Sequence, residues 1–426
     1  MIRPELLIPA GDIEKMRYAF AFGADAVYLG IPRFSLRSRE NGFKNFEQVA
    51  MAVHYAHNLG KKIYVTANVF PHNHKLASFN TYIAQLLALC QPDAWIMSDP
   101  GLIMLMREYF PGQVIHISVQ SNVINHASVR FWQNNGAKRI VVSREISIEE
   151  IKQMHEACPE VELESFVHGA VCMAYSGRCL ISNYLSNRDG NQGACANSCR
   201  WKYKIYQKEG RAAYEPLEGQ FYLKESERPG QLFELDEDEN GSYLMNSKDL
   251  CAIHLLGQLR DAGVCSFKVE GRSKSVYYVA MTTRAYRRAI DDMAAGKPFN
   301  PELMQEILST SNRGFIDGFL RGDPGGNGQE YLMSNSQYSS YRYTGIVRQY
   351  DALKKRLKVE ARNSIKVGAN YELCLPQKNI FIQVKELFNE KGSPINELHG
   401  GSLAGWISYP DDPGPFVLMR EPITSL

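Results

Sequence analysis

Four cysteines close together in the chain carry the most specific chemical signal of the sequence. They follow the spacing Cys172-x6-Cys179-x15-Cys195-x3-Cys199. The second pair is separated as in a zinc knuckle, whereas the first pair is wider than such sites usually show. An iron–sulfur cluster is larger than one ion and accepts thiolates from wider loops. The spacing alone therefore leaves three interpretations open: an iron–sulfur cluster, a zinc site or four unligated thiols.

Glycines interleave with these cysteines, and they favour the cluster. Glycine lets backbone N–H groups approach the sulfides of a cluster closely; the glycines concerned are Gly169, Gly177, Gly190 and Gly193. The C-x3-C-x2-C pattern of radical enzymes is absent, because Lys202 stands where its third cysteine would be. Four protein thiolates leave no iron open, so such a cluster suits electron transfer or sulfide-mediated chemistry.

The composition predicts a soluble globular protein of the cytoplasm. Hydrophobic residues make up 44% and charged residues 22% of the chain, and no stretch reaches the length of a membrane span. The 48 Lys and Arg against 46 Asp and Glu give a net charge of +2. No global field then attracts nucleic acid, so an RNA partner requires a local basic patch.

The elements that must position these cysteines alternate between β-rich runs and helical patterns. Asn45, Pro100 and the pair Ser147 and Glu150 are predicted to open helices, and Ser247 is predicted to cap a further one. The eight predicted strands are Glu5 to Ala10, Ala24 to Gly30, Lys61 to Ala67, Ala94 to Ser98, Val114 to Val119, Lys138 to Val142, Val161 to Val167 and Val264 to Glu270. Eight such units predict an α/β fold with a (β/α)8 TIM-barrel-like domain, with a doubly wound open sheet as the alternative.

Strands seven and eight are separated by a segment too long for a plain connection. This insertion, about residues 168–246, contains all four clustered cysteines. From about Tyr343 the pattern changes to short strands separated by Gly, Pro and Asn. We therefore predict a catalytic domain over residues 1–335 and a small all-β, barrel-like domain over residues 336–426.

Several motifs of the chain resemble those of the collagenase-like U32 peptidase family. The signature is similar at Glu164-x-Phe166-x2-Gly169-Ala170-Val171-Cys172 and at Gly177-x-Cys179-x-Ile181-Ser182. Four further segments resemble the RNA-modifying branch of the family: Asn191 to Trp201, Asn246 to Leu250, Lys268 to Ser275 and Arg313 to Phe315. The resemblance runs nearly from end to end. It implies a [4Fe–4S] cluster on the four cysteines, prephenate as cosubstrate and the anticodon loop of tRNA as substrate.

The C-terminal ends of barrel strands are where the reactive groups of such a fold gather. Prephenate carries two carboxylates, which guanidinium groups bind in bidentate fashion. The strand ends and the turn after strand eight supply the predicted substrate-binding residues Arg39, Asn68, Gln120, Arg144 and Arg272, with Arg37 beside the first of them. For catalysis we predict His168, Lys268 and Glu270. The alternative is that His168 is a core residue and that Glu270 only pairs with Lys268 or Arg272.

Two basic segments are candidates for binding tRNA. Arg284, Arg287 and Arg288 lie at helical spacing on one face of a helix that begins after Ser275. Arg200 and Lys202 follow the last cysteine and alternate with aromatic residues. Basic and aromatic side chains together suit an unpaired loop, whose bases can stack while its phosphates are neutralised. The alternative for each patch is an ordinary solvated face.

The resemblance thus implies an enzyme that hydroxylates C5 of the wobble uridine to 5-hydroxyuridine. An electron donor or an iron–sulfur assembly protein is a further expected partner. One alternative is a peptidase, but the sequence contains neither H-E-x-x-H nor G-x-S-x-G. A cysteine nucleophile at Cys172 or Cys179 with His168 as its base remains conceivable. A non-catalytic RNA-binding partner is the other alternative.

Overall fold

The computed structural model describes most of the chain with its side chains, over residues 3–37, 41–172, 174–199, 201, 247–322, 324, 338–401 and 403–423. Backbone alone is described for residue 200 and for β8 (Tyr206–Glu209), β9 (Ala213–Pro216), β10 (Phe221–Lys224), β11 (Leu232–Leu235), β12 (Glu237–Asp238) and β13 (Gly241–Ser242). The chain forms two compact units, of which the first comprises Met1–Ile13, Asp25–Ser273 and Asn312–Gln337. The predicted boundary at residues 335/336 lies outside the described residues.

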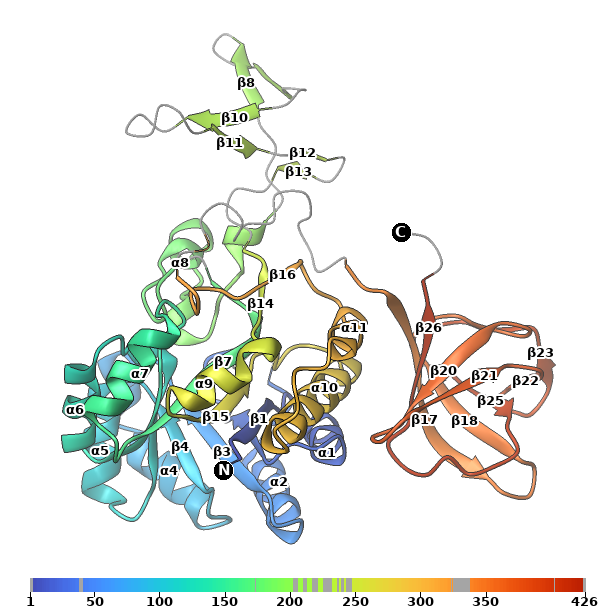
Figure 1. Ribbon diagram of the computed structural model, residues 1–426, viewed down its shortest axis with the longest axis horizontal. Coiled ribbons are helices and arrows are strands. Elements are labelled where there is room, and N and C mark those ends of the chain that lie inside the picture. The colour runs from blue at the N-terminus through green and yellow to red at the C-terminus, as the bar shows by residue number, and fades with distance from the viewer. Residues whose placement is uncertain are drawn as a thin grey trace. The chain divides into compact units, whose positions relative to one another are not determined.

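Parallel strands of the first unit close into a barrel (Figure 1). They are β1 (Glu5–Pro9), β2 (Ala26–Gly30), β3 (Lys62–Ala67), β4 (Ala94–Met97), β5 (Ile115–Ile117), β6 (Ala137–Val141), β7 (Glu162–Ala170) and β15 (Val264–Val269). The closing strand β15 pairs with both β1 and β7, so that Ser266 lies opposite Glu5 on one side and Glu164 on the other. This closure confirms the TIM-like barrel and excludes the open sheet.

Helices follow the strands, and their caps lie where the sequence predicts them. Asn45 and Ser147 accept backbone N–H groups at the starts of α2 and α7, and Glu150 completes a capping box with Ser147. Pro100 is the first residue of α5. The helices are α1 (Ile13–Ala21), α2 (Phe46–Asn58), α3 (Asn73–Leu76), α4 (Phe79–Leu87), α5 (Pro100–Tyr109), α6 (His126–Asn134), α7 (Ile148–Ala157), α8 (Ile181–Ser186) and α9 (Leu256–Asp261).

The prediction that Ser247 caps a helix is wrong. Its hydroxyl donates to the carbonyl of Val171, at 2.6 Å, and the chain then enters β14 (Asp249–Cys251). This strand runs antiparallel to β7 and also pairs with β16 (Phe315–Ile316). The segment after Ser247 forms backbone hydrogen bonds with β7 and therefore adopts a strand and not a helix. Helix α9 begins only after the 3-10 turn Ile253–Leu255.

The second compact unit contains Glu14–Ala24, which includes nearly all of α1, together with α10 (Val276–Ala294), α11 (Glu302–Leu308) and the predicted all-β domain. Its antiparallel sheet comprises β17 (Tyr341–Asp351), β18 (Arg356–Ala361), β20 (Asn370–Cys374), β21 (Asn379–Gln383), β22 (Leu387–Asn389), β23 (Pro394–Ile395), β25 (Ala404–Ser408) and β26 (Leu418–Pro422), beside the pair β19 (Ile365–Lys366) and β24 (Glu397–Leu398). Alternating residues of these strands, such as Leu357, Val359 and Leu373, form a separate buried core. No helix of the described residues has the length and hydrophobicity needed to cross a membrane.

A charged network fills the lower part of the barrel lumen. The Glu164 carboxylate is fully buried and accepts from Lys268 Nζ at 2.7 Å and from Arg139 Nη1 at 3.1 Å. Arg139 also contacts Glu5 at 2.6 Å, and the Ser266 hydroxyl lies 3.2 Å from Glu5 and 3.1 Å from Glu164. Burial alone would raise the pKa of Glu164, but the two cations lower it to about 2.

Removing this carboxylate leaves two buried cations without their shared partner. Glu164→Ala is expected to lower the free energy of unfolding by about 3–5 kcal/mol in urea denaturation. Glu162→Ala is the control, because its side chain is 34% exposed although it pairs with the same Arg139; it should cost at most about 1 kcal/mol. Equal losses would contradict the argument.

The Glu164 carboxylate also makes the free energy of unfolding depend on pH. Because the folded pKa of Glu164 is below its unfolded value of about 4.3, its contribution is complete above that pH. The contribution should vanish as the pH falls from about 4.3 to about 2, and Glu164→Ala should lack this part of the acid dependence.

Candidate functional site

A cavity of about 200 Å³ opens at the C-terminal ends of the barrel strands. Strand residues such as Tyr28, Thr66 and Phe166 form its floor, and loops that follow the strands form its sides. The cysteine-containing insertion contributes the remaining wall with Cys172, Cys179, Cys195 and Cys199. One cavity therefore joins the polar barrel mouth to the four thiols, as expected for the active site of this fold.

Glu270 is the centre of the polar half of the cavity. Its carboxylate lies 3.7 Å from Arg37 Nη2, 3.9 Å from Arg144 Nη2 and 3.2 Å from the Tyr28 hydroxyl. Burial would raise the pKa of Glu270, but Arg37, Arg144 and Arg272 lower it below its ordinary value. The side chain is therefore a carboxylate at neutral pH. Three guanidinium groups around one carboxylate leave an excess of two positive charges, which favours a dianionic ligand.

Two of these arginines, Arg144 and Arg272, are held in place at the barrel mouth. Arg144 stacks on Phe166, with its guanidinium carbon 3.8 Å from the ring centroid. Arg272 is buried and donates to Thr66 Oγ1 at 3.3 Å and to the carbonyl of Leu36. A ligand carboxylate would meet preorganised donors, because their orientations are already fixed.

Arg37 is the residue that the sequence argument missed. We predicted its neighbour Arg39, which lies outside the described residues. Both follow the second strand, so position could identify the loop but not the side chain that turns inward. Arg37 has a left-handed backbone, with φ of 57°, and its side chain lines the cavity.

The structure brings most of the other predicted residues to the cavity. Asn68, Gln120, Arg144, Lys268, Glu270 and Arg272 all line it. Lys268 does so at the bottom, where it pairs with Glu164 and not with Glu270 as the sequence alternative had it. Glu164 belongs to the motif that resembles the family signature. Its position in a predicted barrel strand was the signal that could have identified it.

His168, our predicted proton donor or acceptor, is not placed at the cavity by the structure, so its role stays a prediction. A β-bulge shifts the register between β7 and β15, so that Lys268 pairs with Phe166 but Val269 pairs with His168. The extra residue reverses the inward alternation of β7. The His168 ring is buried against Phe315, with centroids 5.4 Å apart, and it does not belong to the cavity lining that the structure describes.

The four cysteines come from turns that are tied together by hydrogen bonds. The Arg188 guanidinium donates to the carbonyls of Ala194 and Cys195, at 3.0 and 3.3 Å. The Asn191 amide donates to the carbonyl of Cys179 at 3.2 Å, and the backbone N–H of Asn197 points at Cys195 Sγ, at 3.4 Å. All four cysteines are exposed or half-buried, unlike the buried Cys90, Cys158, Cys251 and Cys374.

This donor set fits an iron–sulfur cluster by its chemistry. Four soft thiol ligands, glycine turns beside them and a backbone N–H directed at a sulfur are the features that such clusters require. Among the described residues, no three His, Cys, Asp or Glu side chains are arranged to hold a single metal ion. The fit therefore rests on the donors and on the cavity that they share.

Two models of one protein family together match most of the chain. The model of peptidase family U32 matches residues 11–330, and that of the family's C-terminal domain matches residues 339–420. The chain belongs to peptidase family U32. This U32 protein is 44% identical to "tRNA hydroxylation protein P" of Escherichia coli, over 97% of its own length and 95% of the relative. It is 42% identical to the protein of the same name from Haemophilus influenzae, over 96% and 94%. It is 30% identical to a "Collagenase" of Porphyromonas gingivalis, over 75% and 73%.

The three arginines of α10 in this U32 protein do not form the basic face that the sequence predicted. Arg284 is buried, forms an ion pair with Glu306 and donates to the carbonyl of Leu375. The Arg287 side chain is 11% exposed and lies 2.9 Å from Asp291. Arg284 and Arg287 pair with acidic side chains and pack against other residues of their own unit. The helical spacing of these arginines therefore reflects packing within the unit.

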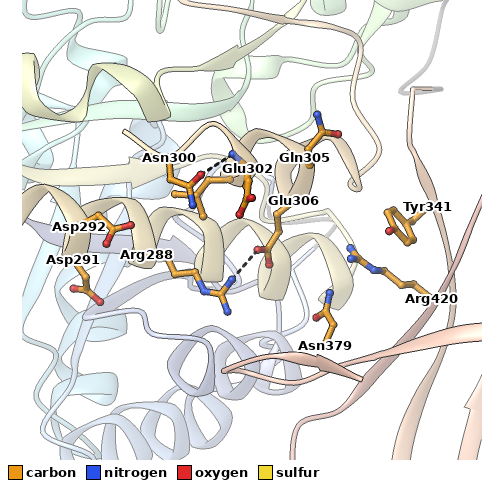
Figure 2. A pocket seen from close by; sticks show the side chains of 11 residues that line it. Arg288, Asp291, Asp292, Asn300, Glu302, Gln305, Glu306, Tyr341, Asn379 and Arg420 are labelled. Atoms are coloured by element: carbon orange, nitrogen blue, oxygen red, sulfur yellow. Dashed lines mark hydrogen bonds and ion pairs between the residues drawn. The ribbon is translucent and has the colours of Figure 1, made fainter. Parts of the chain in front are cut away.

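Arg288 is the most exposed of the three, and its surroundings are acidic. Figure 2 shows it directed at Glu306, with 3.7 Å between Nη1 and the carboxylate. It lines a polar cavity of about 480 Å³ together with Asp291, Asp292 and Glu302. Such a cavity repels phosphate. Of the other predicted RNA contacts, Arg200 is described only in its backbone and Lys202 lies outside the described residues.

Glycine at position 177 is expected to fix the cysteine loop against the barrel. Gly177 has φ of +76°, and an added Cβ would lie 2.1 Å from the carbonyl oxygen of Gln120. Gly177→Ala should lower the free energy of unfolding by at least about 1–2 kcal/mol in denaturant titrations. Gly190→Ala is the matched control, because its Cβ would meet nothing nearer than Cys195 Cβ at 3.6 Å. Similar stabilities of the two variants would contradict this role.

Proposed function

We propose that this U32 protein modifies RNA, and that it hydroxylates C5 of the wobble uridine of tRNA to 5-hydroxyuridine. One observation carries the proposal: four thiols and three guanidinium groups converge on a single cavity. The similarity to proteins named for tRNA hydroxylation supports it along nearly the whole chain. Replacing C5–H by C5–OH is a two-electron oxidation of the base, so the site needs a redox group beside a binding pocket.

Cys172, Cys179, Cys195 and Cys199 would hold a [4Fe–4S] cluster in this proposal. When bound, the cluster supplies one-electron transfer next to the barrel mouth. The chain contributes the geometry: Arg188 and Asn191 fix the turns that carry the thiols, and the N–H of Asn197 is available to a sulfur. Because the base loses two electrons in this reaction, a redox partner that accepts them from the cluster would be required.

Prephenate would occupy the polar half of the cavity as cosubstrate. Its two carboxylates match the excess of two positive charges that Arg37, Arg144 and Arg272 leave over Glu270. In this arrangement Glu270 orients the guanidinium groups, since its own carboxylate is already surrounded by them. Lys268 adds a positive charge to the floor of the cavity but is held by Glu164.

The wobble base would enter the same mouth from an unpaired anticodon loop. A base must leave the stack before an enzyme can reach C5, and an unpaired base leaves it at lowest cost. Asn68 and Gln120 line the cavity and provide amide groups of the kind that can pair with the edge of uracil. Asn68 already accepts from the backbone of Leu36, at 3.1 Å, which orients its amide.

Peptide hydrolysis finds less support in the same cavity. A cysteine nucleophile needs a base within hydrogen-bonding distance. No histidine belongs to the cavity lining that the structure describes, and His168 packs against Phe315. We therefore propose RNA modification, and not peptide hydrolysis, as the reaction of this cavity.

Nucleoside mass spectrometry tests the proposed function. tRNA from cells that lack this activity should gain 5-hydroxyuridine when the wild-type protein is expressed and not when Cys195→Ala is expressed. Anaerobically purified wild type should contain about four irons and four sulfides per chain, most of which Cys195→Ala loses.

Cys251→Ala is the control for this experiment, because that buried thiol ends β14 and lies outside the cavity. It should keep both the iron and the modification. A protein that carries stoichiometric zinc, or that cleaves peptides while tRNA nucleosides stay unchanged, would contradict the proposal.

Charge variants test the proposed prephenate site by calorimetric titration. Arg144→Gln should weaken prephenate binding by about 10-fold or more, since it removes a charge-assisted hydrogen bond. Glu270→Gln should strengthen it, because the negative charge nearest to the ligand is removed. Arg288→Gln, outside the cavity, is the control and should bind as wild type does. Weaker binding by Glu270→Gln would show that the ordering of the guanidinium groups by Glu270 outweighs the repulsion of its charge.

A further inference from the structure

Large apolar side chains are unusually exposed on the cysteine insertion. Tyr175, Leu180, Tyr184, Leu185 and Trp201 are 59%, 69%, 91%, 50% and 39% exposed. We call these five residues the α8 surface. They are five of the seventeen large hydrophobic side chains that are exposed among the described residues, although they come from one short segment. A concentration of this kind marks an interaction site more often than chance exposure.

The α8 surface is held at the mouth of the cavity. Tyr175 lines the cavity itself, Leu180 directly follows Cys179, and Trp201 lies two residues after Cys199. The hydroxyl of Ser182 in α8 donates to the carbonyl of Arg188 at 2.6 Å and accepts from the N–H of Ala196 at 2.8 Å. These bonds fix α8 to the cysteine turns.

The side chains of this surface are suited to stacking. The Trp201 indole N–H donates to the carbonyl of Ala196 at 3.1 Å, which orients the ring while leaving 39% of the residue exposed. Tyr184 follows Leu180 at the i, i+4 spacing, which places both on one side of the helix. Because the Trp201 ring is already held, it would lose little conformational entropy when a flat ligand covers it.

The charges of the same segment select among partners. Between residues 174 and 201 the sequence contains Arg178, Arg188 and Arg200 but only one acidic residue, Asp189. Arg178 is exposed beside the aromatic residues. A positive surface that presents aromatic rings fits single-stranded nucleic acid, because the rings stack on bases and arginine meets phosphates. An acidic cavity such as that beside Arg288 lacks this complementarity.

We propose that the α8 surface binds the unpaired nucleotides of an RNA loop by stacking, with Tyr184 and Tyr175 as its main contacts. This inference rests on the proposed function, and it replaces the α10 arginines as the route by which the RNA reaches the cavity. Paired RNA offers no free base faces, so the surface should prefer a loop to a duplex.

Equilibrium binding to two RNA probes tests this proposal with the full-length protein. The probes are an anticodon stem–loop and the same stem extended into a continuous duplex. Tyr184→Ala should weaken stem–loop binding about 10-fold or more, since stacking on one aromatic ring is lost. Tyr184→Phe should bind like wild type. The salt dependence of the remaining binding should stay unchanged, because no charge has been removed.

Tyr109→Ala is the matched control, since Tyr109 is 53% exposed at the end of α5 and away from the insertion. It should bind the stem–loop as wild type does. Unchanged affinity of Tyr184→Ala in a protein that binds and modifies RNA would overturn this inference alone. Reduced modification at saturating RNA with unchanged affinity would assign the surface to a protein partner instead. A wild type that neither binds nor modifies RNA would overturn the proposed function as well.

Discussion

The buried carboxylate of Glu164 is the interaction on which the barrel depends. Closing β15 between β1 and β7 brings Ser266 and Lys268 into the same lumen as Arg139. Two cations in a closed lumen would repel each other and remain unsolvated. Glu164 accepts from both of them, at 2.7 and 3.1 Å, and so makes the closure possible.

That network also separates the charges buried in the barrel from those that face the cavity. Lys268 is held from below by Glu164, and one layer above it Glu270 is surrounded by arginines that face the cavity. Tyr28 spans the two layers, because its ring lies 4.6 Å from Lys268 Nζ and its hydroxyl lies 3.2 Å from Glu270. The lower layer is neutralised within the fold, so the surplus positive charge is presented only at the mouth.

The insertion after β7 adds four thiols to the lining of the cavity. It leaves the barrel through Gly169, whose φ of +105° and close approach to the carbonyl of Glu270 exclude a larger residue. β14 then pairs with the outer part of β7 and returns the chain to the barrel. The segment that contains the cysteine turns and α8 therefore begins and ends at β7, the strand that also contains Phe166. As a result, the thiols, the arginines and the α8 surface lie around one opening.

The sequence by itself determined the elements and the four cysteines that line the cavity. Eight strands at nearly their true positions, most helix caps and the four cysteines follow from local patterns: apolar runs, capping residues and spacing that neighbouring residues enforce. Tertiary structure alone decided which side chains face the cavity. One bulged residue in β7 turns His168 outward, a backbone conformation in the loop after β2 directs Arg37 inward, and packing within the second unit buries Arg284. Orientation of this kind depends on the register and on contacts between segments far apart in the chain, and these are physical constraints that no local pattern contains.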